Sequence, residues 1–289
     1  MAYYFIRALS LLACLLPASV ADAIGHGLAA LLWPFVPKRR KELAKGNAAR
    51  CLGVSGTEAG RIARASALRF GPMLMEVLRF PSIVKKMDSY VELVGAEHMR
   101  EGLALGRGGV IATSHSGNWE LMGGALAHAG FPIVGVAKKQ KDAAMDRFIN
   151  EYRRLVGMHI TYNSDVREMF RLLKEGWVIG LLMDQDPDRR DGIVLDFFGQ
   201  PTNTVTGPAA LARFQDVPIF PVFITRRADG THLLTIQKPV FVEKTKNKQE
   251  DIRRTMQELN DRLEANVREH PEEWFWLHDR WKSMREEKG

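Results

Sequence analysis

The sequence has few of the residues that build disulfide frameworks or metal sites. Its 289 residues include two cysteines, Cys14 and Cys51, which is too few for the disulfide framework of a small secreted domain. This shortage favours a reducing compartment. The eight histidines form neither an HExxH motif nor another paired spacing typical of metal ligands. We therefore predict that the protein binds no metal and uses no cofactor.

Internal repeats and low-complexity linkers are missing as well. A chain of this length can bury a substantial core in one large domain or two small ones. Because the sequence contains no linker, we predict one domain over residues 38–289, preceded by a separate N-terminal segment over residues 1–37.

The formal net charge is +7, and the basic residues are not evenly scattered. One run covers residues 38–41 (KRRK), and Lys45 and Arg50 follow closely. A basic surface favours an anionic partner, which leaves membrane lipid, nucleic acid and an acidic carrier protein open.

Two apolar runs precede this basic run. Residues 3–21 contain one charge and, as a helix, would reach roughly 28 Å, about the thickness of a membrane's hydrocarbon core. The second run covers residues 23–36 and ends beside the basic residues. Positive charge downstream of an apolar segment favours retention of the following chain in the cytoplasm. We expect a retained membrane anchor with the body of the protein on the cytoplasmic side.

Two alternatives for this N-terminal segment stay open. Arg7, the apolar stretch and residues 18–21 (ASVA) resemble the three parts of a cleaved signal peptide. Pro17 and Asp22 interrupt a straight span, so a helical hairpin that lies partly in the membrane interface fits as well.

Beyond the N-terminal runs, the hydrophobic pattern alternates between helical and strand periods. Residues 57–80 have helical spacing, with a break expected at Gly71 and Pro72. Strands are expected at residues 91–94, 110–113, 133–137, 178–183, 193–197, 219–224, 233–236 and 240–242, and helices at 97–105, 120–129, 143–156, 166–174, 208–214 and 252–267. The pattern predicts an α/β fold with a mostly parallel mixed sheet flanked by helices.

The strongest candidate for chemistry is the stretch from Gly109 to Glu120. Its first half is β-branched and apolar, which indicates a buried strand, and His115 falls where that strand ends. Residues 116–118 are turn and N-cap types before an apolar helical run. Open α/β sheets place their chemistry at such strand ends.

Glu120 follows His115 by five positions, in the first turn of the expected helix. We expect the chain to fold back so that the carboxylate meets the imidazole, fixes its tautomer and stabilises the imidazolium that forms when His115 takes a proton. No serine or cysteine nucleophile is required if the acceptor substrate brings its own hydroxyl. A solvated surface pair without function is the alternative.

Other polar residues are expected near the same sheet edge. Asp184, Gln185 and Arg190 lie in the loop after the strand at 178–183. Arginines in such a loop suit phosphate or carboxylate recognition, although a surface turn with internal ion pairs is an equal alternative. Lys138 belongs to a basic cluster that is a candidate contact for an anionic headgroup, with a solvated lysine loop as the alternative.

Residues 271–282 (PEEWFWLHDRWK) concentrate three of the six tryptophans beside basic residues that include Arg280. Tryptophan next to arginine and lysine favours contact with a membrane surface or acyl chains. A closing core segment that docks on the sheet is the alternative, and both readings are compatible.

Together these segments resemble the late (secondary) acyltransferases of lipid A biosynthesis, which belong to the wider glycerolipid-type acyltransferases with an HX4(D/E) motif. The resemblance runs from about residue 91 to residue 282 and includes the N-terminal anchor. It is carried, in chain order, by residues 115–120 (HSGNWE), 183–185 (MDQ), 197–199 (FFG), 204–207 (TVTG) and 271–278 (PEEWFWLH).

The resemblance implies His115 as the general base and Glu120 as its partner. Candidate substrate contacts are Asn118, Lys138, Asp184, Gln185, Arg190, Thr206 and Arg280. Two of these depart from the family's pattern. At Lys138 many members have an arginine followed by proline, and before Arg280 this chain has His278-Asp279 where members often have His-Arg.

The implied function is transfer of a fatty acyl chain from acyl carrier protein to a hydroxyl of an anionic, acylated glycolipid, a lipid A precursor. The implied location is the cytoplasmic side of the bacterial inner membrane. A phospholipid or mannosylated lipid acceptor stays open, as does a non-catalytic lipid- or carrier-binding protein. Nucleic-acid binding explains the charge but neither the tryptophan-rich end nor the apolar N-terminus, so we expect no nucleic-acid partner.

Overall fold

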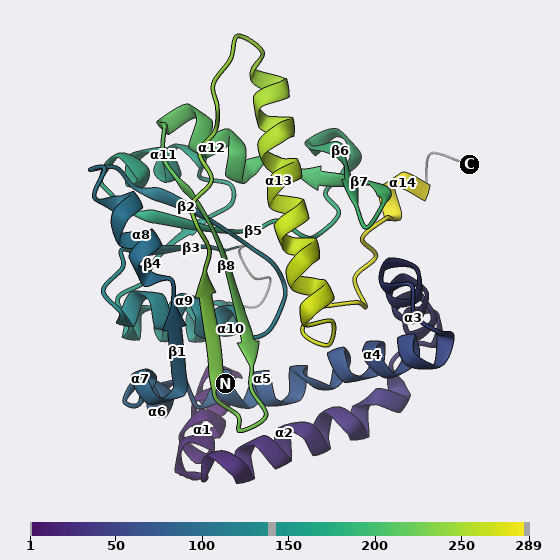
Figure 1. Ribbon diagram of the computed structural model, residues 1–289. Coiled ribbons are helices and arrows are strands. Elements are labelled where there is room, and N and C mark those ends of the chain that lie inside the picture. Colours follow the sequence, from purple (N-terminus) through teal and green to yellow (C-terminus); the bar gives the residue numbers. More distant parts are fainter. Residues whose placement is uncertain (1, 138–142, 286–289) are drawn as a thin grey trace.

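The computed structural model describes residues 2–137 and 143–285. Its strands are β1 (Val91–Val94), β2 (Gly109–Thr113), β3 (Ile133–Ala137), β4 (His159–Tyr162), β5 (Val178–Leu182), β6 (Gly192–Phe197), β7 (Gln200–Val205), β8 (Ile219–Arg226) and β9 (His232–Ile236). Seven of them form one sheet in the order β1-β9-β8-β2-β5-β3-β4, while β6 and β7 pair as a separate antiparallel hairpin (Figure 1).

Neighbouring strands in the large sheet are parallel, except that β8 and β9 are antiparallel. The expected α/β fold with a mostly parallel mixed sheet is therefore confirmed. At the centre, β2 lies between β5 and β8, so the loops that follow β2 and β5 leave the same edge of the sheet.

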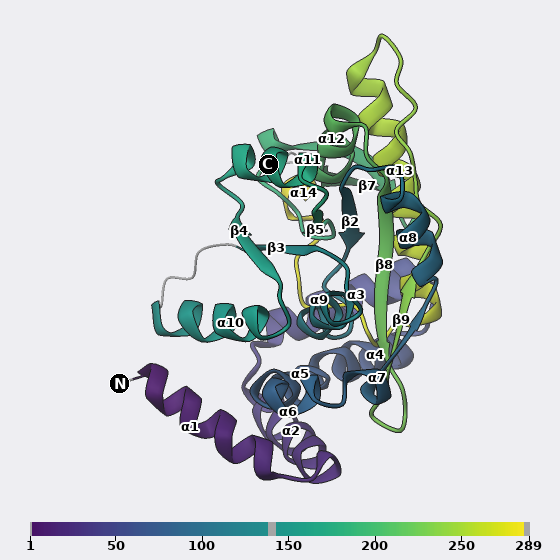
Figure 2. The same cartoon turned by 90° about the vertical axis from the view of Figure 1, so that its left-hand side faces the viewer.

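The helices cover both faces of this sheet. They are α1 (Ala2–Leu15), α2 (Ala18–Leu32), the 3₁₀ turn η1 (Trp33–Phe35), α3 (Lys38–Leu52), α4 (Gly56–Leu68), α5 (Phe70–Leu78), α6 (Phe80–Val84), α7 (Met87–Tyr90), α8 (Ala96–Leu103), α9 (Trp119–His128), α10 (Ala143–Leu155), α11 (Val166–Lys174), the 3₁₀ turn η2 (Arg189–Asp191), α12 (Gly207–Gln215), α13 (Lys248–Glu269) and α14 (Lys282–Arg285). Figure 2 shows α9 and α10 on one side of the strands and α13 on the other.

Side chains of alternate strand residues supply two cores, one on each face. Val110 and Ile179 pack with α11, α12 and α13, whereas Ile111 and Val178 pack with α6, α8, α9 and α10. The first core also contains Trp274, Trp276 and Trp281, each less than 5% exposed. The C-terminal tryptophans therefore close the core rather than present a surface.

The structure differs from the sequence pattern in several elements, and the helices α3, α7 and α14 were not predicted. β4 and β7 were not expected, and the strand expected at 240–242 is reduced to one bridge between Val240 and Ile219. The helical break falls at Arg69, and Pro72 lies in the first turn of α5, where its missing N–H removes no helical bond.

At the N-terminus, α1 packs against α10 and α5, and α2 runs crosswise to α1 and packs along α5 (Figure 1, Figure 2). The crossing of α2 and α5 is a backbone contact, because a Cβ on Gly71 would lie 2.0 Å from the carbonyl oxygen of Gly25. The outward faces of α1, α2 and η1 are apolar. Leu15 at the end of α1 is 80% exposed, and Phe35 at the end of η1 is 78% exposed.

None of the helices in the described residues is, by itself, long and apolar enough to cross a bilayer. The segments Ala18–Phe35 and Lys38–Leu52 meet the length and composition criteria as a pair, but they are bent by 108°.

Candidate active site

His115 lies in a tight turn between β2 and α9. Gly117 has φ 57°, and a Cβ there would lie 2.2 Å from the carbonyl oxygen of Ile224, so the turn requires glycine. Asn118 then caps α9 by accepting a hydrogen bond from the backbone N–H of Leu121 at 3.0 Å. The strand end, the glycine and the cap together hold His115 at the rim of the sheet.

The partner of His115 is Asp184, the second residue after β5. The imidazole Nδ1 lies 2.8 Å from Asp184 Oδ1, and the backbone N–H of His115 donates to both carboxylate oxygens at 3.0 and 3.1 Å. Trp274 donates its indole N–H to Oδ2 at 2.9 Å. The parallel neighbours β2 and β5 bring the two side chains together across 69 residues of sequence.

This pair perturbs both titrations. Burial opposes ionisation of Asp184, but the His115 imidazole and the surrounding N–H donors outweigh burial and lower the pKa of the carboxyl group. Burial likewise opposes the charged form of His115, but the Asp184 carboxylate outweighs it and raises the pKa of the imidazole. A histidine with a fixed tautomer and a raised pKa has the properties of a general base.

With Nδ1 bound to Asp184, the other ring nitrogen of His115 is free to act on a substrate. The side-chain amide of Gln185 donates a long hydrogen bond of 3.4 Å to this Nε2 atom, and Gln185 is exposed, so a substrate hydroxyl can take its place. The indole of Trp119 lies edge-on to the imidazole, with 5.0 Å between ring centroids. The side chain of His115 is 19% exposed, so the reactive nitrogen is accessible although the ring is mostly buried.

The expected contact between His115 and Glu120 is not formed. Glu120 is held by Arg153 of α10 in a bidentate pair, Oε1 to Nη2 at 2.7 Å and Oε2 to Nε at 3.0 Å. Because Glu120 is the second residue of α9, the helix directs its carboxylate toward α10 rather than back to the turn. The carboxylate that orients His115 therefore comes from the loop after β5.

An apolar cavity of about 280 Å³ begins beside His115 and Trp119. It extends between α9 and the face of β2, β5 and β3, and Glu120 and Arg153 lie in its wall. Its other lining residues are Ile111, Thr113, Met122, Gly123, Leu126, Ile133, Val134, Gly135, Val136, Ala137, Met158, Gly180 and Leu182. An apolar pocket with a few polar groups at its mouth suits a ligand with a hydrocarbon chain and a polar end.

Comparison with known proteins shows the family of this chain. Residues 1–283 match the family described as bacterial lipid A biosynthesis acyltransferase. The chain belongs to this acyltransferase family. The resemblance seen in the sequence motifs is thereby confirmed.

Curated relatives fall into two groups by name. A phosphatidylinositol mannoside acyltransferase of Mycolicibacterium smegmatis is 29% identical, over 83% of this chain and 79% of the relative. The lipid A biosynthesis lauroyltransferase of Escherichia coli is 26% identical, over 94% of this chain and 88% of the relative. A solved 1-acyl-sn-glycerophosphate acyltransferase from Thermotoga maritima aligns with 87% of this chain and 98% of its own at 13% identity and a TM-score of 0.40.

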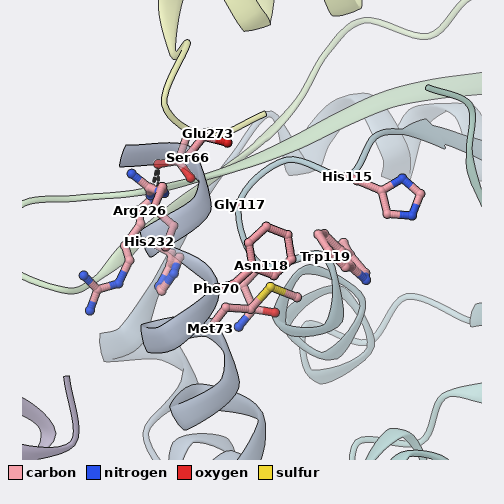
Figure 3. A pocket seen from close by; sticks show the side chains of 11 residues that line it. Ser66, Phe70, Met73, His115, Gly117, Asn118, Trp119, Arg226, His232 and Glu273 are labelled. Carbon is pink, nitrogen blue, oxygen red and sulfur yellow. Dashed lines mark hydrogen bonds and ion pairs between the residues drawn. The ribbon is translucent and has the colours of Figure 1, made fainter. Parts of the chain in front are cut away.

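In this member of the acyltransferase family, Asn118 has a second contact that ties the turn of His115 to α5. Its side-chain amide donates to Glu76 at 2.8 Å, and Glu76 also accepts from Arg226 at 3.2 Å. Arg226 in turn pairs with Asp22 of α2 at 2.6 Å. Figure 3 shows the His115 ring directed away from Arg226, with Asn118 and Trp119 between them. Asn118 is thus a buried structural residue of the turn, 3% exposed.

The remaining candidates are spread over the structure. Arg280 is buried and donates to the carbonyl of Asn203 and to Thr204 Oγ1, which fastens the C-terminal segment to β7. Thr206 stands at the N-cap position of α12 without a side-chain cap bond, and Arg190 is exposed. Lys138 lies outside the described residues. Within residues 2–137 and 143–285, no group of three or more His, Cys, Asp and Glu side chains is arranged to hold a metal ion.

Sequence reasoning missed Arg153 and Trp274 as supports of the site, and it placed Asp184 among substrate contacts rather than beside His115. A signal for Asp184 was present, since it follows a buried strand whose end lies beside that of β2. For Arg153 there was no such signal, because its contact with Glu120 depends on how α10 packs against α9.

Proposed function

We propose that this protein is a membrane-associated O-acyltransferase. It transfers a fatty acyl chain from an acyl carrier protein thioester to a hydroxyl of an anionic, acylated glycolipid such as a lipid A precursor. The observation that carries the proposal is the His115–Asp184 pair at the mouth of the apolar cavity. The cavity holds the acyl chain, and the pair activates the acceptor hydroxyl beside the thioester carbonyl.

The reaction uses Nε2 of His115, the ring nitrogen that Asp184 does not bind. Nε2 takes the proton of the acceptor hydroxyl as the oxygen attacks the thioester carbonyl carbon. The tetrahedral intermediate collapses with cleavage of the carbon–sulfur bond, and the imidazolium returns its proton to the departing thiolate. Asp184 keeps Nδ1 protonated and stabilises the imidazolium throughout.

Membrane association is supported by the exposed apolar faces of α1, α2 and η1. We place these helices flat in the membrane interface, because α1 and α2 are packed against the body along their inner sides while Leu15 and Phe35 point outward. The basic start of α3 then meets anionic headgroups on the cytoplasmic leaflet. Sedimentation with anionic vesicles tests this: Leu15→Glu should weaken binding, and unchanged binding would exclude this face as the contact.

A mannosylated phospholipid is the second candidate acceptor. It is favoured by the relatives named phosphatidylinositol mannoside acyltransferase, at 29% identity, beside the 26% of the lauroyltransferase. Both acceptors are anionic lipids with sugar hydroxyls, so the His115–Asp184 pair and the apolar cavity suit either one.

Mass spectrometry of lipid products tests the function. The full chain is incubated with acyl carrier protein thioesters and with either a lipid A precursor or a mannosylated phosphatidylinositol. We expect one acceptor to gain one acyl group, and His115→Ala to lower that rate at least about 100-fold. A protein that binds both lipids and the thioester but forms no acylated product would instead be a non-catalytic binding protein.

A further inference from the structure

A second apolar cavity, of about 20 Å³, lies behind the one that begins at His115. It is lined by Val77, Phe80, Ile149 and Tyr152, together with three residues that also line the first cavity, Glu120, Arg153 and Met158. These three side chains therefore form the partition between the two spaces. Two of them make a bidentate ion pair, and the third is an uncharged thioether that is 7% exposed.

Three glycines around the first cavity have no conformational reason to be glycine. Gly123, Gly135 and Gly180 come from α9, β3 and β5, and none is among the residues with positive φ. Gly135 and Gly180 are register partners, so their missing side chains leave one trough across two strands. A Cβ on Gly180 would make only an ordinary contact, 3.5 Å from the carbonyl oxygen of Val134. Gly180 therefore leaves space open for a ligand, whereas Gly123 and Gly135 make room for the Met158 side chain at one end of the trough.

Met158 fills the far end of this trough. Its terminal methyl would lie 2.8 Å from a Cβ on Gly123 and 3.3 Å from one on Gly135, so it occupies space between α9 and β3. The residue lies in the connection between α10 and β4, after Gly157, whose φ is 80°. Methionine adapts its shape readily to irregular apolar gaps.

We propose that Met158 sets the length of acyl chain that the enzyme accepts, by closing the first cavity against the second. The proposal rests on the proposed function in taking the ligand to be a fatty acyl chain. The thioether meets the end of a chain that fits the first cavity. A longer chain requires its displacement, after which the terminal carbons enter the space beside Phe80 and Tyr152.

The other two members of the partition cannot open in this way. Separating Glu120 from Arg153 would leave two charges without partners at side chains that are 24% and 17% exposed, which is costly. Moving Met158 changes only apolar contacts. Tyr152, which lines the second cavity, is held in place because its hydroxyl is hydrogen-bonded to Ser10 of α1. A chain that passes Met158 therefore has room for a limited number of further carbons.

Binding of free fatty acids tests the proposal without requiring transfer. Even-numbered saturated acids from octanoate to stearate displace a fluorescent fatty acid from the full-length protein, and the acid bound most tightly marks the preferred length. Met158→Ala should move this preference by two or more carbons toward longer chains, and Gly180→Ala should move it toward shorter ones. Burying one methylene is worth roughly 0.8 kcal/mol, so a two-carbon step changes relative affinity about tenfold.

Met169→Ala is the matched control, because Met169 of α11 is similarly buried, 5% exposed against 7% for Met158, but packs in the opposite core. It should leave the preferred length unchanged. If Met158→Ala does not fold, Met158→Val tests the shift toward longer chains and Gly180→Ala tests the shift toward shorter ones. Fatty acids that bind with the same length preference in every variant would overturn the role of Met158 and leave the proposed transfer untouched. Length preferences that shift as expected in a protein without transferase activity would instead contradict the proposed function.

Discussion

Asp184 and Glu120 are both carboxylates near His115, but they lie in very different surroundings. Asp184 is 3% exposed and accepts hydrogen bonds from the imidazole, the backbone N–H of His115 and the indole of Trp274. The Glu120 side chain is 24% exposed and is bound by Arg153 alone among the residues described. One carboxylate holds the imidazole of His115, and the other lies in the wall of the apolar cavity.

The difference shows how a parallel sheet assembles a site. Loops after adjacent parallel strands emerge at one edge, so residues far apart in sequence meet there. The start of a helix, by contrast, turns successive side chains by about 100°, and the second helical residue already points away from the strand end. Proximity in sequence therefore favours the wrong carboxylate here.

The largest expected effect comes from removing the charge of each carboxylate in turn. Asp184→Asn keeps the size of the side chain but no longer stabilises the imidazolium, so we expect the transfer rate to fall by about 100- to 10,000-fold. Glu120→Gln should cost less than about tenfold, because it touches only the cavity wall. Steady-state rates with one thioester donor and one acceptor measure both. Equal losses in the two variants would contradict the assignment of Asp184 as the partner of His115.

A smaller effect is expected when the Glu120–Arg153 pair is broken. Each single variant, Glu120→Gln or Arg153→Met, leaves one partly buried charge without its partner, whereas the double variant leaves none. We expect a coupling free energy of about 1 to 2 kcal/mol in urea unfolding. Additive effects of the two substitutions would show that the pair contributes nothing to stability.

Most of the fold was predictable from the sequence because buried strands are apolar and β-branched. Strands such as β3 were predicted with their exact bounds, and β2 and β5 within one residue. The hairpin strand β7 was not, since Pro201 and Asn203 are typical of turns. It pairs only with β6, where an edge position tolerates proline. β4 was missed because only two of its four residues, Ile160 and Tyr162, are apolar, whereas β1 of the same length has three.

For the site, the sequence predicted which residues lie at one edge of the sheet but not which of their atoms are in contact. His115 could be placed at a strand end, and the loop of Asp184 at the same edge, from the alternation of strands and helices alone. Which atoms meet could not be predicted, because the 2.8 Å contact depends on strand order, and β2 neighbours β5 rather than β3. The buried position of Arg280 was equally hidden, since a charged side chain is expected at the surface.

The smallest effect concerns the pH dependence of the reaction. The Asp184 carboxylate outweighs burial and raises the pKa of His115. Only the unprotonated imidazole can accept a proton, so kcat/KM falls as pH drops below the pKa of His115 in the free enzyme. In Asp184→Asn, burial is no longer opposed by the charge, the pKa falls, and the acid limb moves to lower pH even though the maximal rate is reduced. Glu120→Gln should leave the limb in place, because Glu120 is not among the groups that shift His115. If the acid limb of the pH profile shifts in Glu120→Gln but stays in place in Asp184→Asn, the roles of the two carboxylates are reversed.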